Sequence, residues 1–160
     1  MLFDQELMEA KNLLNPMEQV DHPAVMKMKG KLTRQIFQSH RASILASKAF
    51  RNFLSASREW VIPYAVFCVL RDQYGTADFS KWEDWAIYDK KRVDELASPS
   101  GAKWPEIAYH IWLQCELDKQ LTDAVAHLHE KGLALKGDLP IGIDRQSVEA
   151  WSAPHLFKMD

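Results

Sequence analysis

An acid that follows a short apolar run is the residue of this chain best placed to do chemistry. Residues 133–135 lead into Gly137, Asp138 and Pro140, a pattern typical of a strand that ends in a loop with an acid at its mouth. An α/β barrel presents its site residues in this way. The carboxylate of Asp138 can then accept hydrogen bonds from hydroxyl groups of a ligand, whereas the simpler alternative is an aspartate that fixes the turn before Pro140. The residues alone favour the turn.

Aromatic side chains are the second group that could serve a ligand. Trp151 could offer its ring as a stacking platform, but Ser147 and the three residues after it have the pattern of one helical turn, so packing is the preferred role. Trp82 and Trp85, with Tyr88, could line a groove for a ligand, and their helical spacing again favours the core.

The other reactive groups form no recognisable site. His127 and His129 are two residues apart, so on a helix they point in different directions and cannot hold one metal ion together. Two pairs of adjacent acids are interpreted as solvated helix surface: Glu83 with Asp84, and Asp94 with Glu95. The sequence contains no Cys/His ligand cluster, no Gly-rich phosphate loop and no Gly-x-Ser-x-Gly elbow. It therefore predicts neither a metal nor another cofactor.

Nearly all of the chain before residue 133 has the periodicity of α-helices. The first four helices are predicted over residues 4–15, 23–40, 43–56 and 58–74. Pro23 suits the first position of the second helix, after Asp21 or His22, and Ser57 suits the N-cap of the fourth. The fourth helix is apolar nearly all round, which is typical of a helix enclosed by others, and Gly75 is a natural stop.

The second half of the chain begins with a less regular stretch. Ser80 and Glu83 have the spacing of a capping box, a short helix through Asp94 can follow, and residues 97–101 are the clearest break in the chain. A long helix is then predicted from residue 104 to residue 130. Its apolar stripe comprises Ile107, Ala108, Ile111, Trp112, Cys115, Leu121, Val125 and Leu128. We expect this helix and the apolar helix near residues 60–70 to share the main core, with strand only at residues 133–143.

Composition and charge limit the kind of protein. The chain has 160 residues, of which 47% are hydrophobic, and a formal net charge of −2, so it can form about one domain with a real core. Acidic and basic residues are nearly balanced, so the sequence lacks the excess of positive charge that is typical of proteins that bind nucleic acid or an anionic membrane. Residues 60–70 form the longest apolar run, which is too short to span a bilayer, and residues 1–4 do not start a signal peptide. The sequence predicts a cytoplasmic protein in which Cys68 and Cys115 are free, buried thiols.

Several of these residues also occur together in a known family. Gly137-Asp138-Leu139-Pro140-Ile141, followed by Ser147, Trp151, Pro154 and Phe157, resembles the third-strand signature of the 4-α-glucanotransferases. This family, glycoside hydrolase family seventy-seven, comprises the amylomaltases and disproportionating enzymes. Upstream residues resemble its helical Trp-x-x-x-Tyr-Ala-x-Phe segment, its tryptophan-rich loop and the helix before the signature strand: Phe53, Trp60, Tyr64-Ala65-Val66-Phe67, Leu70, Trp82, Trp85, Tyr109, Leu113-Gln114 and Gln120-Leu121. The Gly-Ile-Asp-Arg after Ile141 is most similar to the branch of the plant cytosolic disproportionating enzyme and its bacterial relatives.

The resemblance implies a mainly α piece of a larger (β/α)8 TIM barrel. Residues 1–160 would form a single mostly helical unit, with residues 1–100 as a helical insertion region and residues 101–160 as the long helix, a barrel strand and the following loop. The parent would transfer α-1,4-glucan segments between maltooligosaccharides or to glucose, in starch, glycogen or maltose metabolism, by retaining double displacement.

That mechanism needs two carboxylates about 5–5.5 Å apart. The family carries both on strands beyond the signature, so we expect no catalytic residue in this chain and no activity of the chain alone. The family's matching aspartate belongs to the active-site shell. The resemblance therefore favours Asp138 as a substrate-binding residue and leaves Trp151 as a weaker candidate.

A second hypothesis comes from a different class of protein, a helical interaction or carbohydrate-binding module that does no chemistry. It predicts a closed core of its own and an exposed aromatic platform. A piece of a barrel predicts instead an unpaired strand and bare apolar faces, which would lead the free chain to associate with itself.

Overall fold

The fold is given by a computed structural model that describes residues 2–138 and 142–158. Within those ranges the chain is mainly helical and contains no β-strand. Its contacts divide it into two compact units, Met1–Ala46 and Ser47–Asp160. The prediction of a mainly α chain is confirmed, while the division near residue 100 stays a prediction about the parent fold.

The first unit consists of two helices, α1 (Leu2–Leu14) and α2 (His22–Ala46). Asp21 begins α2 by accepting a hydrogen bond from the Ala24 N–H at 3.0 Å. Glu6 joins the helices, because its Oε2 lies 3.0 Å from Lys31 Nζ and accepts a hydrogen bond from Gln35 at 3.4 Å. α2 continues past its predicted end near residue 40, since residues 41–46 include no glycine or proline that would stop it.

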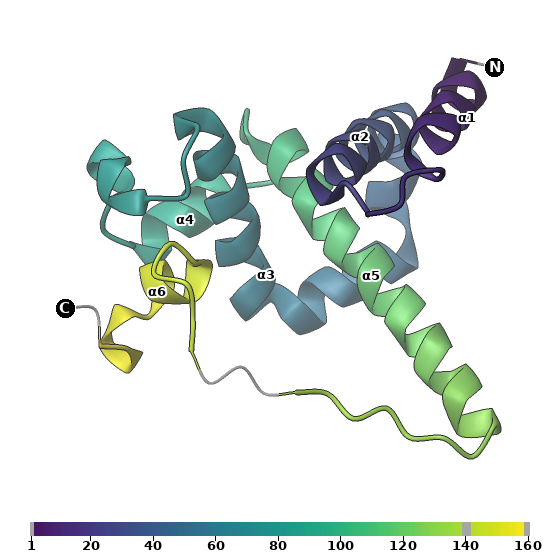
Figure 1. The fold of residues 1–160 in the computed structure, drawn as a ribbon. Helices are drawn as coiled ribbons and strands as arrows, with labels where there is room; N and C mark the ends of the chain where they lie inside the picture. The colour runs from purple at the N-terminus through teal and green to yellow at the C-terminus, as the bar shows by residue number, and fades with distance from the viewer. Residues whose placement is uncertain (1, 139–141, 159–160) are drawn as a thin grey trace. The chain divides into compact units, whose positions relative to one another are not determined.

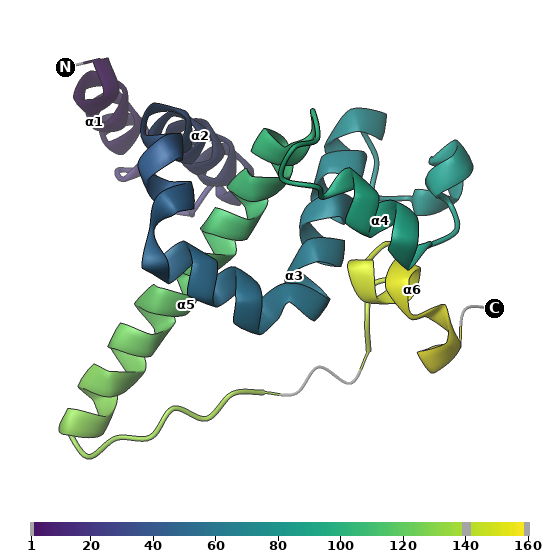
Figure 2. The same ribbon diagram turned by 180° about the vertical axis from the view of Figure 1, so that it is seen from behind.

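The second unit begins with α3 (Lys48–Tyr74), a single helix where the sequence predicts two. Its N-cap is Ser47, whose Oγ accepts the Phe50 N–H at 3.2 Å, and the predicted cap Ser57 lies inside the helix. No glycine or proline flanks Ser57, so the helical backbone continues through it. Pro63 also lies inside α3, which is bent in both ribbon views (Figures 1 and 2). Gly75 ends the helix with φ 67°, as predicted.

The core of this unit lies between α3 and α5 (Trp104–Glu130), which confirms the predicted partnership. Residues 61–70 of α3, apart from Tyr64, are buried, as are residues 107–112 of α5. Two short helices complete the core: α4 (Lys90–Leu96) contributes Val93, and α6 (Val148–Ser152) contributes Ala150 and Trp151. Within the described ranges α3 alone is long and apolar enough to cross a bilayer, yet its central residues pack inside this unit as in a core helix.

Two 3₁₀ turns, η1 (Phe79–Lys81) and η2 (Glu83–Trp85), connect α3 to α4. The predicted capping box of Ser80 and Glu83 is wrong. Asp78 is the cap instead, because its Oδ1 accepts hydrogen bonds from the Ser80 N–H at 3.3 Å and the Ser80 hydroxyl at 2.6 Å. The loop is closed over Trp82, which is completely buried, in agreement with the core interpretation of this residue.

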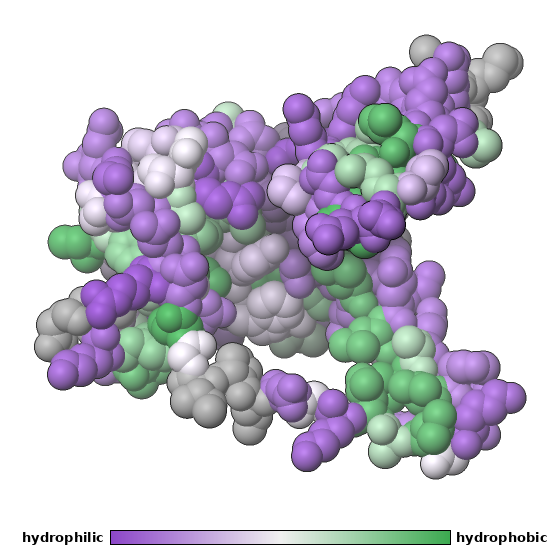
Figure 3. Space-filling view, viewed as in Figure 1, coloured by the Kyte–Doolittle hydropathy of each residue, from purple (hydrophilic) through white to green (hydrophobic). Residues whose placement is uncertain are grey.

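The C-terminal half of α5 departs from the predicted stripe. Burial ends at Trp112, and Leu117 and Leu121 are 56% and 57% exposed. Figure 3 shows apolar residues gathered on this end of the helix. The stripe is therefore fully buried only up to Trp112, and beyond that residue it is partly buried or, as at Leu121, exposed.

Candidate functional site

The candidate site lies in the connection between α5 and α6, which we call the Asp138 segment (residues 133–146). α5 ends at Gly132, which has φ 71°, and the Leu133 N–H then donates to the Leu128 carbonyl at 3.0 Å. Residues 133–138 are exposed and have no regular secondary structure. Asp138 is among them, and its carboxylate makes no hydrogen bond or ion pair with another described residue. Leu139, Pro140 and Ile141 of the signature lie outside the described residues.

The predicted strand over residues 133–143 is not formed in the described part of this segment. A strand needs backbone partners on at least one edge, and no other strand exists in the described chain to supply them. The apolar side chains that favour a strand remain without a sheet to pack in, as Leu133 and Leu135 are 57% and 55% exposed.

The far end of the segment is well ordered by local hydrogen bonds. Asp144 Oδ1 accepts the Gln146 N–H at 2.8 Å, and the Asp144 carbonyl accepts the Ser147 N–H at 3.1 Å. Ser147 Oγ then caps α6 by accepting the Ala150 N–H at 3.3 Å. This confirms the predicted helical turn at residues 147–150, and it brings Trp151 onto the body of the unit.

Trp151 is 2% exposed and lies in an aromatic cluster that we define as Phe67, Trp82, Tyr88 and Trp151. The Trp151 ring centroid lies 5.0 Å from that of Tyr88, 5.7 Å from Trp82 and 5.9 Å from Phe67. Its Nε1 donates to the Trp85 carbonyl at 2.9 Å. Because a sugar needs an open ring face, this packing favours a structural role for Trp151, and its weaker candidacy as a substrate-binding residue stays a prediction.

The other tryptophans of this region, Trp82 and Trp85, also make contacts within the fold. The indole N–H of Trp82 donates to the Thr76 carbonyl at 2.9 Å, so both tryptophans of the aromatic cluster have their polar atom satisfied. Trp85 is half-buried, and the guanidinium of Arg92 lies 4.4 Å from the centroid of its ring. One face of Trp85 is therefore covered by a cation. The link from Trp151 to the Trp85 backbone joins residues 66 apart, and no sequence pattern could have indicated it.

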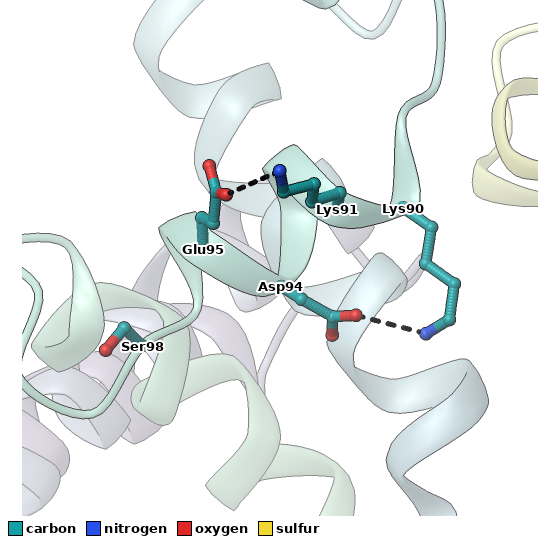
Figure 4. A pocket seen from close by; sticks show the side chains of 5 residues that line it. All are labelled: Lys90, Lys91, Asp94, Glu95 and Ser98. Atoms are coloured by element: carbon teal, nitrogen blue, oxygen red, sulfur yellow. Dashed lines mark hydrogen bonds and ion pairs between the residues drawn. The ribbon is translucent and has the colours of Figure 1, made fainter.

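The acids predicted to be solvated are found on the surface. Lys90 Nζ pairs with Asp94 at 3.2 Å and Lys91 Nζ with Glu95 at 4.0 Å, along the outer face of α4 (Figure 4). With Ser98 these four side chains line a shallow, open hollow in which the charges neutralise one another. The hollow offers no group that is held ready for a substrate.

No group of three or more His, Cys, Asp or Glu side chains that could hold a metal occurs among the described residues. His127 and His129 are both exposed at the end of α5, as predicted. No disulfide joins Cys68 and Cys115, as predicted, but the prediction that both are buried holds for one of them only. Cys68 is buried and Cys115 is only partly buried.

One polar contact that the sequence does not reveal crosses the core. The Gln114 side-chain amide on α5 donates to the Tyr64 hydroxyl on α3 at 3.1 Å. Burial raises the pKa of Tyr64 to about 12. The Tyr64 hydroxyl is thus kept neutral, and its hydrogen bond links the two main helices. It is not the deprotonated phenolate that a nucleophile would need.

Comparisons with known proteins agree along the whole chain. A family model described as 4-alpha-glucanotransferase matches residues 1–160. The 4-alpha-glucanotransferase DPE2 of rice (Oryza sativa subsp. japonica) is 39% identical over 155 residues, which are 97% of this chain and 16% of the rice protein. The 4-alpha-glucanotransferases of Synechocystis and of Thermus thermophilus are each 26% identical, over 95% and 91% of this chain and 30% and 29% of their own lengths. The chain thus spans less than a third of each of these relatives. No solved structure matches it.

Proposed function

The chain belongs to the 4-alpha-glucanotransferase family, and from this premise we propose that it is a non-catalytic part of an enzyme that transfers α-1,4-glucan segments. The observation that carries the proposal is the family match from residue 1 to residue 160. The parent acts on α-1,4-glucans or maltooligosaccharides by retaining double displacement, in the cytoplasm. The first carboxylate attacks the sugar and forms a glycosyl-enzyme intermediate, while the second, as acid, protonates the oxygen of the glucan that leaves. The second then acts as base and takes the proton of the acceptor hydroxyl, which displaces the first carboxylate.

Within the parent, this chain supplies a helical region and one strand of a (β/α)8 barrel. Two observations support this part of the proposal. Leu133 and Leu135 favour strand yet lack a sheet, and the outer half of α5 presents Leu117 and Leu121 to solvent. Both are expected of elements that pack against a barrel. A self-contained interaction or carbohydrate-binding module, the alternative hypothesis, would bury such residues within its own core.

The residue of this chain that we assign to the substrate is Asp138. Its carboxylate is exposed and has no protein partner among the described residues, so its hydrogen-bonding capacity is available to a ligand. At the C-terminal end of a barrel strand, such a carboxylate can accept hydrogen bonds from glucose hydroxyls beside the reacting bond. These contacts strengthen as the sugar ring distorts toward its oxocarbenium-like transition state.

A transfer assay on the complete gene product that carries this chain tests the proposal. With maltotriose alone, transfer gives glucose and longer maltooligosaccharides while the total number of reducing ends stays constant, because each bond broken is replaced by one formed. Glucose and maltose with a rising number of reducing ends would indicate hydrolysis, and an unchanged substrate would indicate no activity. Either result contradicts the proposed function.

A further inference from the structure

Trp60 of α3 is the most exposed of the six tryptophans, all of which lie within the described residues. Its exposed fraction is 50%, whereas the other five are buried or half-buried. It lies outside the aromatic cluster around Trp151, and its Nε1–H donates to no other described residue. The ring therefore adds little to the core of the second unit, and both its surface and its polar atom are open to a ligand.

Two neighbouring rings hold the Trp60 indole in place. Phe53 packs against it edge to face, with ring centroids 6.0 Å apart and an interplanar angle of 88°, and the centroid of Tyr64 lies 6.5 Å away. We call these three side chains the Trp60 row. Their spacing along α3, i, i+7 and i+11, places them on one face of the helix. Because the row is already assembled, a ligand that stacks on Trp60 needs little further ordering of the indole.

Polar atoms border the Trp60 row. The Gln114 amide of α5 donates to the Tyr64 hydroxyl at 3.1 Å, which holds this amide beside the row. Gln114 Oε1 accepts no hydrogen bond from another described residue, so an acceptor on Gln114 and a donor on Trp60 are both available. The row thus combines an apolar ring face with a hydrogen-bond donor and an acceptor that a ligand can use.

The charged residues next to Trp60 in the sequence are paired elsewhere. Arg58 Nη2 lies 3.6 Å from Asp94 Oδ1. Glu59 Oε2 lies 3.9 Å from Lys90 Nζ, so both side chains reach toward α4. The Trp60 row itself carries no charge at neutral pH, and it lacks the cations that an anion such as a nucleic acid requires. It suits a neutral polyol, because the C–H groups of a sugar ring can lie on an aromatic face while the hydroxyls form hydrogen bonds at its edge.

We propose that the Trp60 row binds an α-1,4-glucan: a glucose ring stacks on the indole of Trp60, and its hydroxyls bond to Gln114 Oε1 and to Trp60 Nε1–H. The ligand class rests on the proposed function, since an α-1,4-glucan is the neutral polyol on which the parent enzyme acts. The contact involves described residues of α3 and α5 only and does not depend on Asp138.

Hydroxyl-radical labelling of the complete gene product, read residue by residue with mass spectrometry, tests this site. We expect Trp60 to be oxidised readily without sugar, and its oxidation to fall at least about threefold as maltopentaose is added, because bound ligands bury most of their surface. Cellopentaose, in which the same sugar is β-1,4-linked, should protect it less than about 1.5-fold. Trp85 is the internal control: it is half-buried, the Arg92 guanidinium lies 4.4 Å from its ring centroid, and its oxidation should not change.

Two substitutions separate stacking from a general apolar contact. Trp60→Phe keeps an aromatic face and Trp60→Leu keeps only an apolar side chain, so protection is read at the half-buried Tyr64 in both variants. We expect the concentration of maltopentaose that gives half protection to rise about threefold in Trp60→Phe and about tenfold or more in Trp60→Leu. Ile87→Ala is the matched control, because Ile87 is 82% exposed but lies outside the Trp60 row, and it should leave that concentration unchanged.

The inference is overturned if Trp60 resists oxidation in the complete product without sugar, because the rest of the enzyme then covers it. Equal protection by the two sugars, no protection by either, or equal affinity of the Trp60→Leu and Trp60→Phe variants would overturn it as well, because none of these results fits an α-1,4-glucan stacked on the ring. The transfer assay judges the proposed function separately. A complete product that transfers no glucan, but in which maltopentaose protects Trp60 and cellopentaose does not, overturns the proposed function and supports this binding site.

Discussion

Asp138→Asn in the complete gene product should impair glucan transfer while leaving the stability of the fold almost unchanged. The substitution keeps the size of the side chain and one acceptor oxygen but removes the charge. In the structure the Asp138 side chain is exposed and has no described partner. Loss of its charge therefore breaks no contact that holds the fold, and surface changes of this kind alter the free energy of unfolding by at most about 0.5 kcal/mol.

The expected loss of activity follows from the type of contact. A hydrogen bond to a charged group is worth about 1.5–3 kcal/mol, and about 1.4 kcal/mol corresponds to a factor of 10. If the contact is made mainly in the transition state, kcat/KM should fall by about 10- to 100-fold or somewhat more, with most of the loss in kcat.

The assay is the initial rate of glucose release from maltotriose, combined with thermal unfolding of the same samples. Asp144→Asn is a matched control, because Asp144 lies in the same segment but its carboxylate already accepts the Gln146 N–H at 2.8 Å, and asparagine can form the same turn. We expect transfer within about twofold of the unsubstituted enzyme for this control. Unchanged kinetics together with clearly lower thermal stability in Asp138→Asn would show that Asp138 anchors the turn, and would refute our assignment.

Three further predictions concern the chain itself. Gly75→Ala should lower the free energy of unfolding in urea by about 1 kcal/mol, because φ at this residue is 67°. Gly30→Ala should raise it by up to about 1 kcal/mol, because Gly30 lies inside α2 with open space around its Cα. The pKa of Tyr64 is raised from 10.0 to about 12 in the fold, so the unfolded state releases this proton at a lower pH than the folded state does. The free energy of unfolding should therefore fall as the pH rises from 10 through 12. Tyr64→Phe should remove that part of the fall. The isolated chain should self-associate in sedimentation velocity, and replacing Leu117 and Leu121 by glutamine should shift it toward monomer; a strict monomer before substitution would contradict this.

Local signals in the sequence were sufficient where short-range chemistry decides the structure. Gly75 and Gly132 end their helices in the left-handed conformation, Asp21 begins α2, and Ser147 caps the turn that carries Trp151. The same reasoning failed at Ser57, because a serine prefers a cap but is tolerated inside a helix at small cost when no glycine or proline interrupts the backbone. The helical conformation on both sides of Ser57 was predictable, but the joining of the two predicted helices into one was not.

Long-range packing accounts for the rest. The apolar stripe of α5 continues without change of pattern through Trp112 to Leu121, yet only its first part meets α3. Likewise, the composition of residues 133–135 favours a strand, but a strand forms only when partners exist. Asp138 was proposed as a site residue through its resemblance to a family signature, whereas the hydrogen bond from Trp151 to the Trp85 carbonyl required the fold.

The most direct test of the account is to compare the purified 160-residue chain with the complete gene product in one maltotriose assay at equal molar concentration. We predict that the complete product releases glucose and forms longer maltooligosaccharides at a constant number of reducing ends, and that the isolated chain gives no turnover above a buffer blank. Turnover by the isolated chain that persists through repeated purification, or no transfer by the complete product, would contradict the assignment of this chain as a non-catalytic part of a glucanotransferase.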